Sequence, residues 1–135
     1  MLLDDMATYY SSGGGWTEAT NLFAGDMPAQ PAECLSIYEV PGSPNDHTMG
    51  NVAGQAVLEH AGIQVVSRAA TYQAARRNAQ KAYVLTDGLP TRTINGVQYY
   101  WGSTRQPPFL MGRDEQGLPL ICFNADILKD LSSTS

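Results

Sequence analysis

Lysine and arginine are absent from residues 1–67, although eight acidic side chains lie there. All eight basic residues follow in residues 68–135 together with five acids, so eight bases minus five acids give this half a net charge of +3. Opposite charges in two halves can hold copies of one molecule together across a repeated interface. The alternative is that the two halves interleave in the fold and the charges mix over its surface.

Long apolar runs and cysteine are also scarce. No apolar segment approaches the roughly 18 residues that a membrane span needs, and Asp4 and Asp5 stand where a signal peptide has basic residues. We therefore expect a cytoplasmic protein with no membrane contact. Cys34 and Cys122 lie far apart in strand-like runs, so we expect two small buried side chains and no metal site or redox pair.

The chain has 135 residues, of which 43% are hydrophobic and 16% charged, which is typical of one globular domain. We expect a short N-terminal helix over residues 1–12. The serine- and glycine-rich run at residues 11–15 should end this helix and act as a hinge. Turn-forming residues predict a long loop at residues 41–55, and residues 129–135 should form a frayed tail.

Residues 62–89 predict a strand followed by a helix that packs back on the sheet. Their β-branched run favours a strand, Thr71 is a candidate helix N-cap, and Gly88 is a candidate left-handed C-cap. Apolar residues recur at spacings of three and four, which indicates one buried helix face. This predicted face comprises Tyr72, Ala75, Ala79, Ala82 and Tyr83.

Further strands are expected at residues 34–40, 56–68 and 118–127, and a hairpin at residues 92–102 around Asn95-Gly96. Residues 16–24 fit either a strand or a loop. Two alternating sets should each share one face of a strand: Val97, Tyr99 and Trp101; and Ile121, Phe123, Ala125 and Ile127. The sum is an α+β fold with four or five mostly antiparallel strands, one long helix packed on the sheet and a short N-terminal helix.

Catalytic motifs are not recognisable in the sequence. The three glycines at residues 13–15 lack the Gly-Lys-Ser/Thr of a phosphate loop, and no Gly-x-Ser-x-Gly elbow occurs. His47 and His60 are too far apart in sequence to share a metal on one helix. Asp114 and Glu115 could form an acid–base pair, but their glycine-containing turn favours solvated turn residues. We expect no enzyme, cofactor or metal; a small hydrolase that uses His47 or His60 is the alternative.

Arg76, Arg77 and Lys81 lie off the predicted buried face of the long helix. Such a basic face could follow nucleic acid phosphates, and it would then bind duplex DNA with steep salt dependence. A sequence pI near 4.7 argues against this interpretation. A face that meets an acidic partner protein fits the composition better.

A short N-terminal helix and five segments after it, taken in order, carry a resemblance to a known family. The five segments are residues 21–31, residues 35–42, residues 63–68 with Tyr72 and Ala75, residues 114–117, and residues 121–127. In this order and spacing the chain resembles the minor capsid or tail terminator proteins of long-tailed bacteriophages. It departs from them at Ala69, where glycine is common, and at Leu118-Pro119, where a second arginine is common.

The resemblance implies a structural virion protein at the head–tail junction, assembled in the cytoplasm of the host bacterium. Such proteins form rings, commonly of six copies, that close the tail tube and join it to the connector or stopper protein. The genome would pass through the ring without sequence-specific contact. A head-completion or stopper protein is the alternative. We expect the subunit or partner contacts to involve Arg68, Arg76, Arg77, Lys81, Asn95, Asp114 and Glu115.

Overall fold

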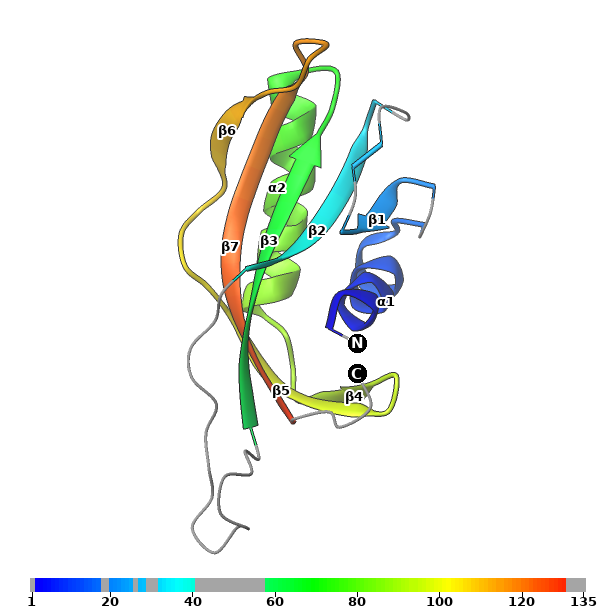
Figure 1. Ribbon diagram of the computed structural model, residues 1–135, viewed down its shortest axis with the longest axis vertical. Coiled ribbons are helices and arrows are strands. Elements are labelled where there is room, and N and C mark those ends of the chain that lie inside the picture. The colour runs from blue at the N-terminus through cyan, green and yellow to red at the C-terminus, as the bar shows by residue number, and fades with distance from the viewer. Residues whose placement is uncertain (1, 18–19, 26, 29–31, 41–57, 131–135) are drawn as a thin grey trace, which may run out of the picture.

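The computed structural model in Figure 1 describes residues 2–17, 20–25, 27–28, 32–40 and 58–130. The predicted loop at residues 41–55, His47 and residues 131–135 lie outside these ranges. The described elements are α1 (Leu2–Gly14), β1 (Leu22–Ala24), β2 (Cys34–Val40), β3 (Leu58–Arg68), α2 (Tyr72–Asp87), β4 (Arg92–Ile94), β5 (Val97–Thr104), β6 (Phe109–Arg113) and β7 (Pro119–Asp130).

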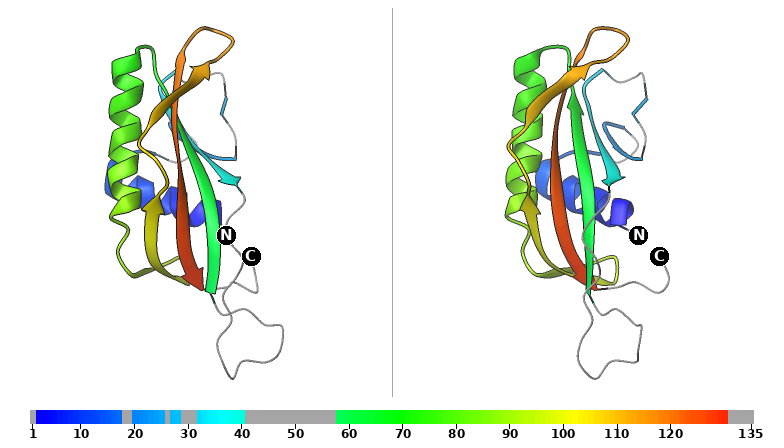
Figure 2. Two further views of the ribbon diagram at one scale, coloured as in Figure 1. Left: turned by 90° about the vertical axis from the view of Figure 1, so that its left-hand side faces the viewer. Right: turned by 60° about the vertical axis from the view of Figure 1, so that its left-hand side comes forward.

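The strands form one curled sheet in the order β1-β2-β3-β7-β5-β4, and β6 pairs with β7 beside β5. All strand pairs are antiparallel except β1 with β2. Figure 2 shows α2 running along the long strands β3 and β7, while α1 crosses them. Neither described helix has the length and apolar character needed to cross a membrane.

The α+β class and the antiparallel preference are confirmed, but the expected strand number is too low. The described sheet has seven strands, because β1 is a strand and a further strand, β6, follows the Pro107-Pro108 pair. β6 escaped the sequence pattern because Phe109, Leu110 and Met111 are all exposed and show no alternation. Residues 129 and 130, expected in a frayed tail, continue β7.

β7 supplies the centre of the core. Its N-terminal half packs beneath α2, and it pairs with β3 along that strand's full 11 residues. The predicted inward set is confirmed, since Ile121, Phe123, Ala125 and Ile127 are all fully buried. Together with side chains from both helices, the last three of these belong to one hydrophobic cluster.

α2 begins where the sequence predicts and buries a face of alanines. The Thr71 hydroxyl accepts a hydrogen bond from the Ala74 amide at 3.2 Å, which confirms the N-cap. Ala75, Ala79 and Ala82 are fully buried. Tyr72 was expected in this face, but it is 44% exposed. Helical side chains lean toward the N-terminus, so a residue of the first turn extends beyond the packed alanines.

Two details of the predicted caps and turns are wrong. Gly88 has φ −97°, so it is not left-handed; its amide instead donates to the Val84 carbonyl at 3.0 Å. α1 continues to Gly14, beyond the predicted bound of residue 12, although the serine- and glycine-rich run at residues 11–15 does end the helix as expected, and Gly15 follows with φ +80°. Gly13 remains helical, close to the Leu85 side chain of α2.

The hairpin at Asn95-Gly96 is confirmed, with φ angles of 50° and 83° that suit a tight β-hairpin turn. The shared face of Val97, Tyr99 and Trp101 is wrong. A register shift between Tyr99 and Trp101 turns their side chains to opposite sides of the sheet, so Tyr99 is fully buried and Trp101 is 39% exposed.

A buried carboxylate attaches this hairpin to α1. Asp5 is 1% exposed and accepts hydrogen bonds from the Tyr99 hydroxyl at 2.6 Å and from the Asn95 amide group at 2.9 Å. The Lys129 ammonium lies 6.0 Å from the centre of the Tyr99 ring and is itself 3% exposed. Buried charges need such partners, because their transfer out of water is costly.

Replacing Asp5 with alanine should lower the free energy of unfolding by about 1–3 kcal/mol, because the buried Tyr99 hydroxyl loses this acceptor. Asp4→Ala, one residue away and exposed, is the matched control. It removes only a favourable charge at the helix N-terminus and should cost at most about 1 kcal/mol. Urea unfolding of both variants measures the difference; equal losses would contradict the buried role of Asp5.

Candidate interaction surface on the second helix

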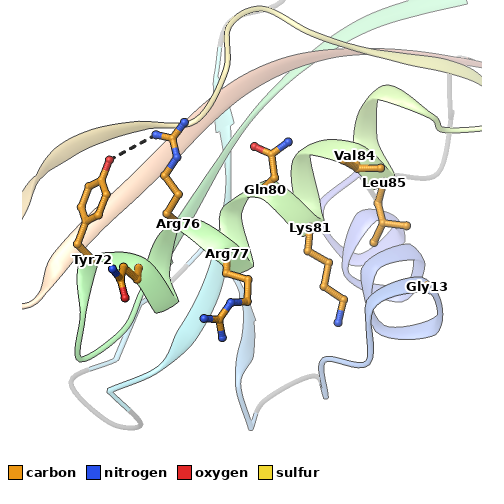
Figure 3. A pocket seen from close by; sticks show the side chains of 9 residues that line it. Gly13, Tyr72, Arg76, Arg77, Gln80, Lys81, Val84 and Leu85 are labelled. Atoms are coloured by element: carbon orange, nitrogen blue, oxygen red, sulfur yellow. Dashed lines mark hydrogen bonds between the residues drawn. The ribbon is translucent and has the colours of Figure 1, made fainter.

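An open groove of about 780 Å³ runs over the outer face of α2 and the C-terminal end of α1. Its lining is mainly apolar, with three cationic side chains around it (Figure 3). The lining residues are Gly13, Tyr72, Gln73, Arg76, Arg77, Gln80, Lys81, Val84 and Leu85.

The buried alanines explain why this surface faces outward. Ala75, Ala79 and Ala82 bring one side of α2 close to the sheet, so the residues on its opposite side face solvent. Val84 is the most exposed of the large apolar side chains that the structure describes, at 59%. An apolar floor bordered by cations suits a protein partner that carries both carboxylates and apolar groups.

Three cations border the groove, and each has a different environment. Arg76 extends toward β6, and its guanidinium donates to the Pro108 carbonyl at 2.8 Å. The same guanidinium also donates to the Tyr72 hydroxyl at 3.5 Å, the bond drawn in Figure 3. Lys81 lies with its ammonium 5.1 Å from the centre of the Trp16 ring. Arg77 is exposed. None of the three forms an ion pair with a carboxylate of the described residues.

Arg68 was predicted to take part in subunit or partner contacts together with these cations, and the structure places it away from the groove. It lies at the end of β3, is 3% exposed, and donates to the carbonyls of Ala32 at 3.0 Å and Pro28 at 2.5 Å. Its guanidinium is also 3.5 Å from the Asp114 carboxylate. These contacts hold the segment before β2 against the β6–β7 turn, which gives Arg68 a role inside the subunit.

Asp114 and Glu115 lie at the turn between β6 and β7, but only Glu115 is solvated as their sequence context favours, since the Asp114 side chain is 19% exposed. One Asp114 oxygen accepts from the amides of Gln116 at 3.0 Å and Leu118 at 2.8 Å, and the other faces Arg68. Glu115 is exposed beside them. A smaller cavity of about 220 Å³ lies here, lined by Met27, Arg68, Asp114, Glu115 and Gln116.

Asn95 is also engaged within the subunit, because its side-chain amide donates to Asp5 and to the Thr8 hydroxyl at 3.2 Å. A contact of this hairpin with a neighbour therefore remains a prediction. Of the seven predicted interface residues, the structure brings three into the groove and pairs Arg68 with Asp114 at a separate position.

The β6 edge is a surface that the sequence analysis missed. Phe109, Leu110 and Met111 are 41%, 47% and 48% exposed, and β6 pairs only with β7 among the described strands. Arg76 connects this edge to the groove through Pro108. The three consecutive large apolar residues after two prolines were the available signal, since a strand with one buried face would alternate.

Groups capable of catalysis are dispersed in the described part of the chain. No cluster of three or more histidine, cysteine, aspartate or glutamate residues occurs in it. The His60 ring faces Trp101 at 6.5 Å between ring centres. Burial raises the pKa of the Cys34 thiol more than the nearby Arg68 lowers it, and burial also raises the pKa of Cys122. Both thiols are therefore protonated, weak nucleophiles at neutral pH.

Comparison with known proteins gives one family match and several similar folds. The family described as "Bacteriophage tail terminator protein" matches residues 4–130. A solved structure described as "Virion of native gene transfer agent (GTA) particle" has a TM-score of 0.52 and 11% identity, and covers 93% of this chain and 84% of that chain. A second solved structure has a TM-score of 0.52 and 14% identity, and the match covers 92% of this chain and 94% of that chain. At these identities the two structures show the fold alone. No curated protein matches the sequence.

Arg68→Met should lower the free energy of unfolding by about 1–3 kcal/mol, because two partly buried carbonyls and Asp114 lose their donor. Methionine retains the length of the aliphatic stem, so lost packing contributes little. Arg77→Met is the matched control and should change stability by less than about 0.5 kcal/mol, since Arg77 is exposed. Chemical denaturation compares the two; an unchanged Arg68→Met would disprove the internal role.

Proposed function

Because the chain belongs to the bacteriophage tail terminator family, we propose that it forms a homo-oligomeric ring, of six copies, that closes the tail tube at the head–tail junction. A structural role in the phage tail follows from the family itself, and the fold shared with a gene transfer agent virion agrees with it. The proposal adds the ring, its position and its non-enzymatic character.

The observation that carries this proposal is the family match, which spans residues 4–130 and therefore nearly the whole described fold. In this role one surface of the ring binds the last ring of the tube protein and the opposite surface binds the connector or stopper. The subunits assemble in the host cytoplasm and remain in the virion. The genome passes through the ring without sequence-specific contact.

A ring of identical subunits needs two different, complementary surfaces on every subunit, because each copy meets its neighbours head to tail. The α2 groove supplies one surface with three cations and an apolar floor. The first 67 residues, which contain acids and no bases, supply opposite charge on the same chain. This distribution of charge supports a head-to-tail arrangement.

The proposal predicts that the purified protein caps tail tubes that lack their terminator. Electron microscopy should show added density at the head-proximal end, and the symmetry of that density gives the number of copies. Binding to filled heads instead of tails would make the protein a stopper or head-completion component. Binding to neither would contradict both assignments.

In the same assay, reversing two cations of the groove with Arg76→Glu and Arg77→Glu should abolish capping while the subunit remains folded. Arg76→Lys with Arg77→Lys is the matched control, since it keeps both charges and should still cap tails. Circular dichroism checks the fold, which is necessary because Arg76 also contacts the Pro108 carbonyl. Normal capping by the folded reversal variant would remove these two cations from the proposed interface.

A further inference from the structure

Among the residues that the structure describes, none of complementary charge occupies the α2 groove. Arg76, Arg77 and Lys81 form no ion pair with a carboxylate of the described residues. Their three charges surround an apolar floor that includes the exposed Val84. A partner that fills this groove should present carboxylates together with side chains that cover Val84.

The described N-terminal half presents two exposed carboxylates suited to this role. Asp4 lies in the first turn of α1 and Glu39 lies near the end of β2, and both are exposed. Neither carboxylate forms an ion pair or hydrogen bond with another described residue. Glu33 differs, because it accepts a hydrogen bond from Asn78 of α2 at 3.3 Å.

Asp4 and the cations of the α2 groove are too far apart to neutralise each other inside one subunit. Gly13 lines the groove at one end of α1, and Asp4 lies nine residues earlier at the other end. At the rise of an α-helix this separation is about 14 Å along the axis. Asp4 is therefore set apart from the groove of its own subunit, and it can face the groove of a second copy.

We propose that the α2 groove of one subunit receives the α1–β2 side of a second copy, with Asp4 and Glu39 facing Arg77 and Lys81. This inference deepens the proposed ring and rests on it. The contact is heterologous, since each copy offers its groove to one neighbour and its acidic side to the other. A polyanion such as DNA is a poorer occupant, because the chain carries −5 and the groove floor is apolar.

Zero-length cross-linking tests the contact directly. A carbodiimide joins an amine to a carboxylate only when the two touch, with loss of one water as the amide forms. Rings assembled on tails from isotopically labelled and unlabelled protein should yield mixed-label peptides that join Lys81 to Asp4 or Glu39. Capped tails whose Lys81 instead joins to the tube protein would overturn the inference and leave the terminator role intact.

Charge-reversal variants provide a second test of the proposed contact between subunits. Arg77→Glu with Lys81→Glu, and separately Asp4→Lys with Glu39→Lys, should each raise the protein concentration for half-maximal capping by about tenfold or more. The chain that carries all four substitutions should regain capping, because opposite charges face each other again. Arg76 is left unchanged here, since it holds the Pro108 carbonyl of its own subunit.

The variant Val84→Ala distinguishes a loss of docking in the groove from a loss of folding. Val84 is 59% exposed and alanine favours helix more than valine, so the subunit should be at least as stable while capping weakens. Full capping by both two-site reversals, or loss of capping that the four-site variant does not restore, would overturn the inference. If the wild-type chain fails to cap tails, the proposed function fails, and the Lys81 cross-link in concentrated purified protein still decides the subunit contact.

Discussion

Pairing of β7 on both of its edges is the interaction on which the rest of the structure depends. β3 occupies one edge over its full length, and β5 and β6 share the other. Because the backbone polar groups of β7 are satisfied by these neighbours, Phe123 and Ile127 can be fully buried between the sheet and the helices. The positions of α2 and of the groove on its outer face follow from that core.

The small side chains on the buried face of α2 determine which of its residues face solvent. Ala75 and Ala79 allow α2 to approach the sheet closely, and the opposite helix face is then left with cations and the exposed Val84. Arg76 extends the same surface toward β6, because its guanidinium binds the Pro108 carbonyl. Arg76 therefore links the groove to the apolar β6 edge.

Two buried charged groups show that local sequence patterns do not reveal which charged side chains are buried. Arg68 follows a β-prone run and precedes a basic helix, so its sequence context gives it the same character as Arg76 and Arg77. Tertiary structure instead surrounds it with carbonyls and Asp114 from segments distant in sequence. Asp5 is equally unlike its neighbour Asp4, because only Asp5 reaches the hairpin. Whether a charged side chain is buried and which groups it binds depend on contacts between segments that are distant in sequence.

The sequence by itself determined the α+β class, the β2 and β7 strands, the α2 N-cap and its alanine face, and the hairpin at Asn95-Gly96. Each depends on local periodicity or turn chemistry, which a short segment encodes. Tertiary structure alone decided that β6 forms an edge strand, that a bulge turns Trp101 away from Tyr99, and that Arg68 lies inside the subunit. These features depend on which distant strands pair and on what covers each face, and no local pattern records that.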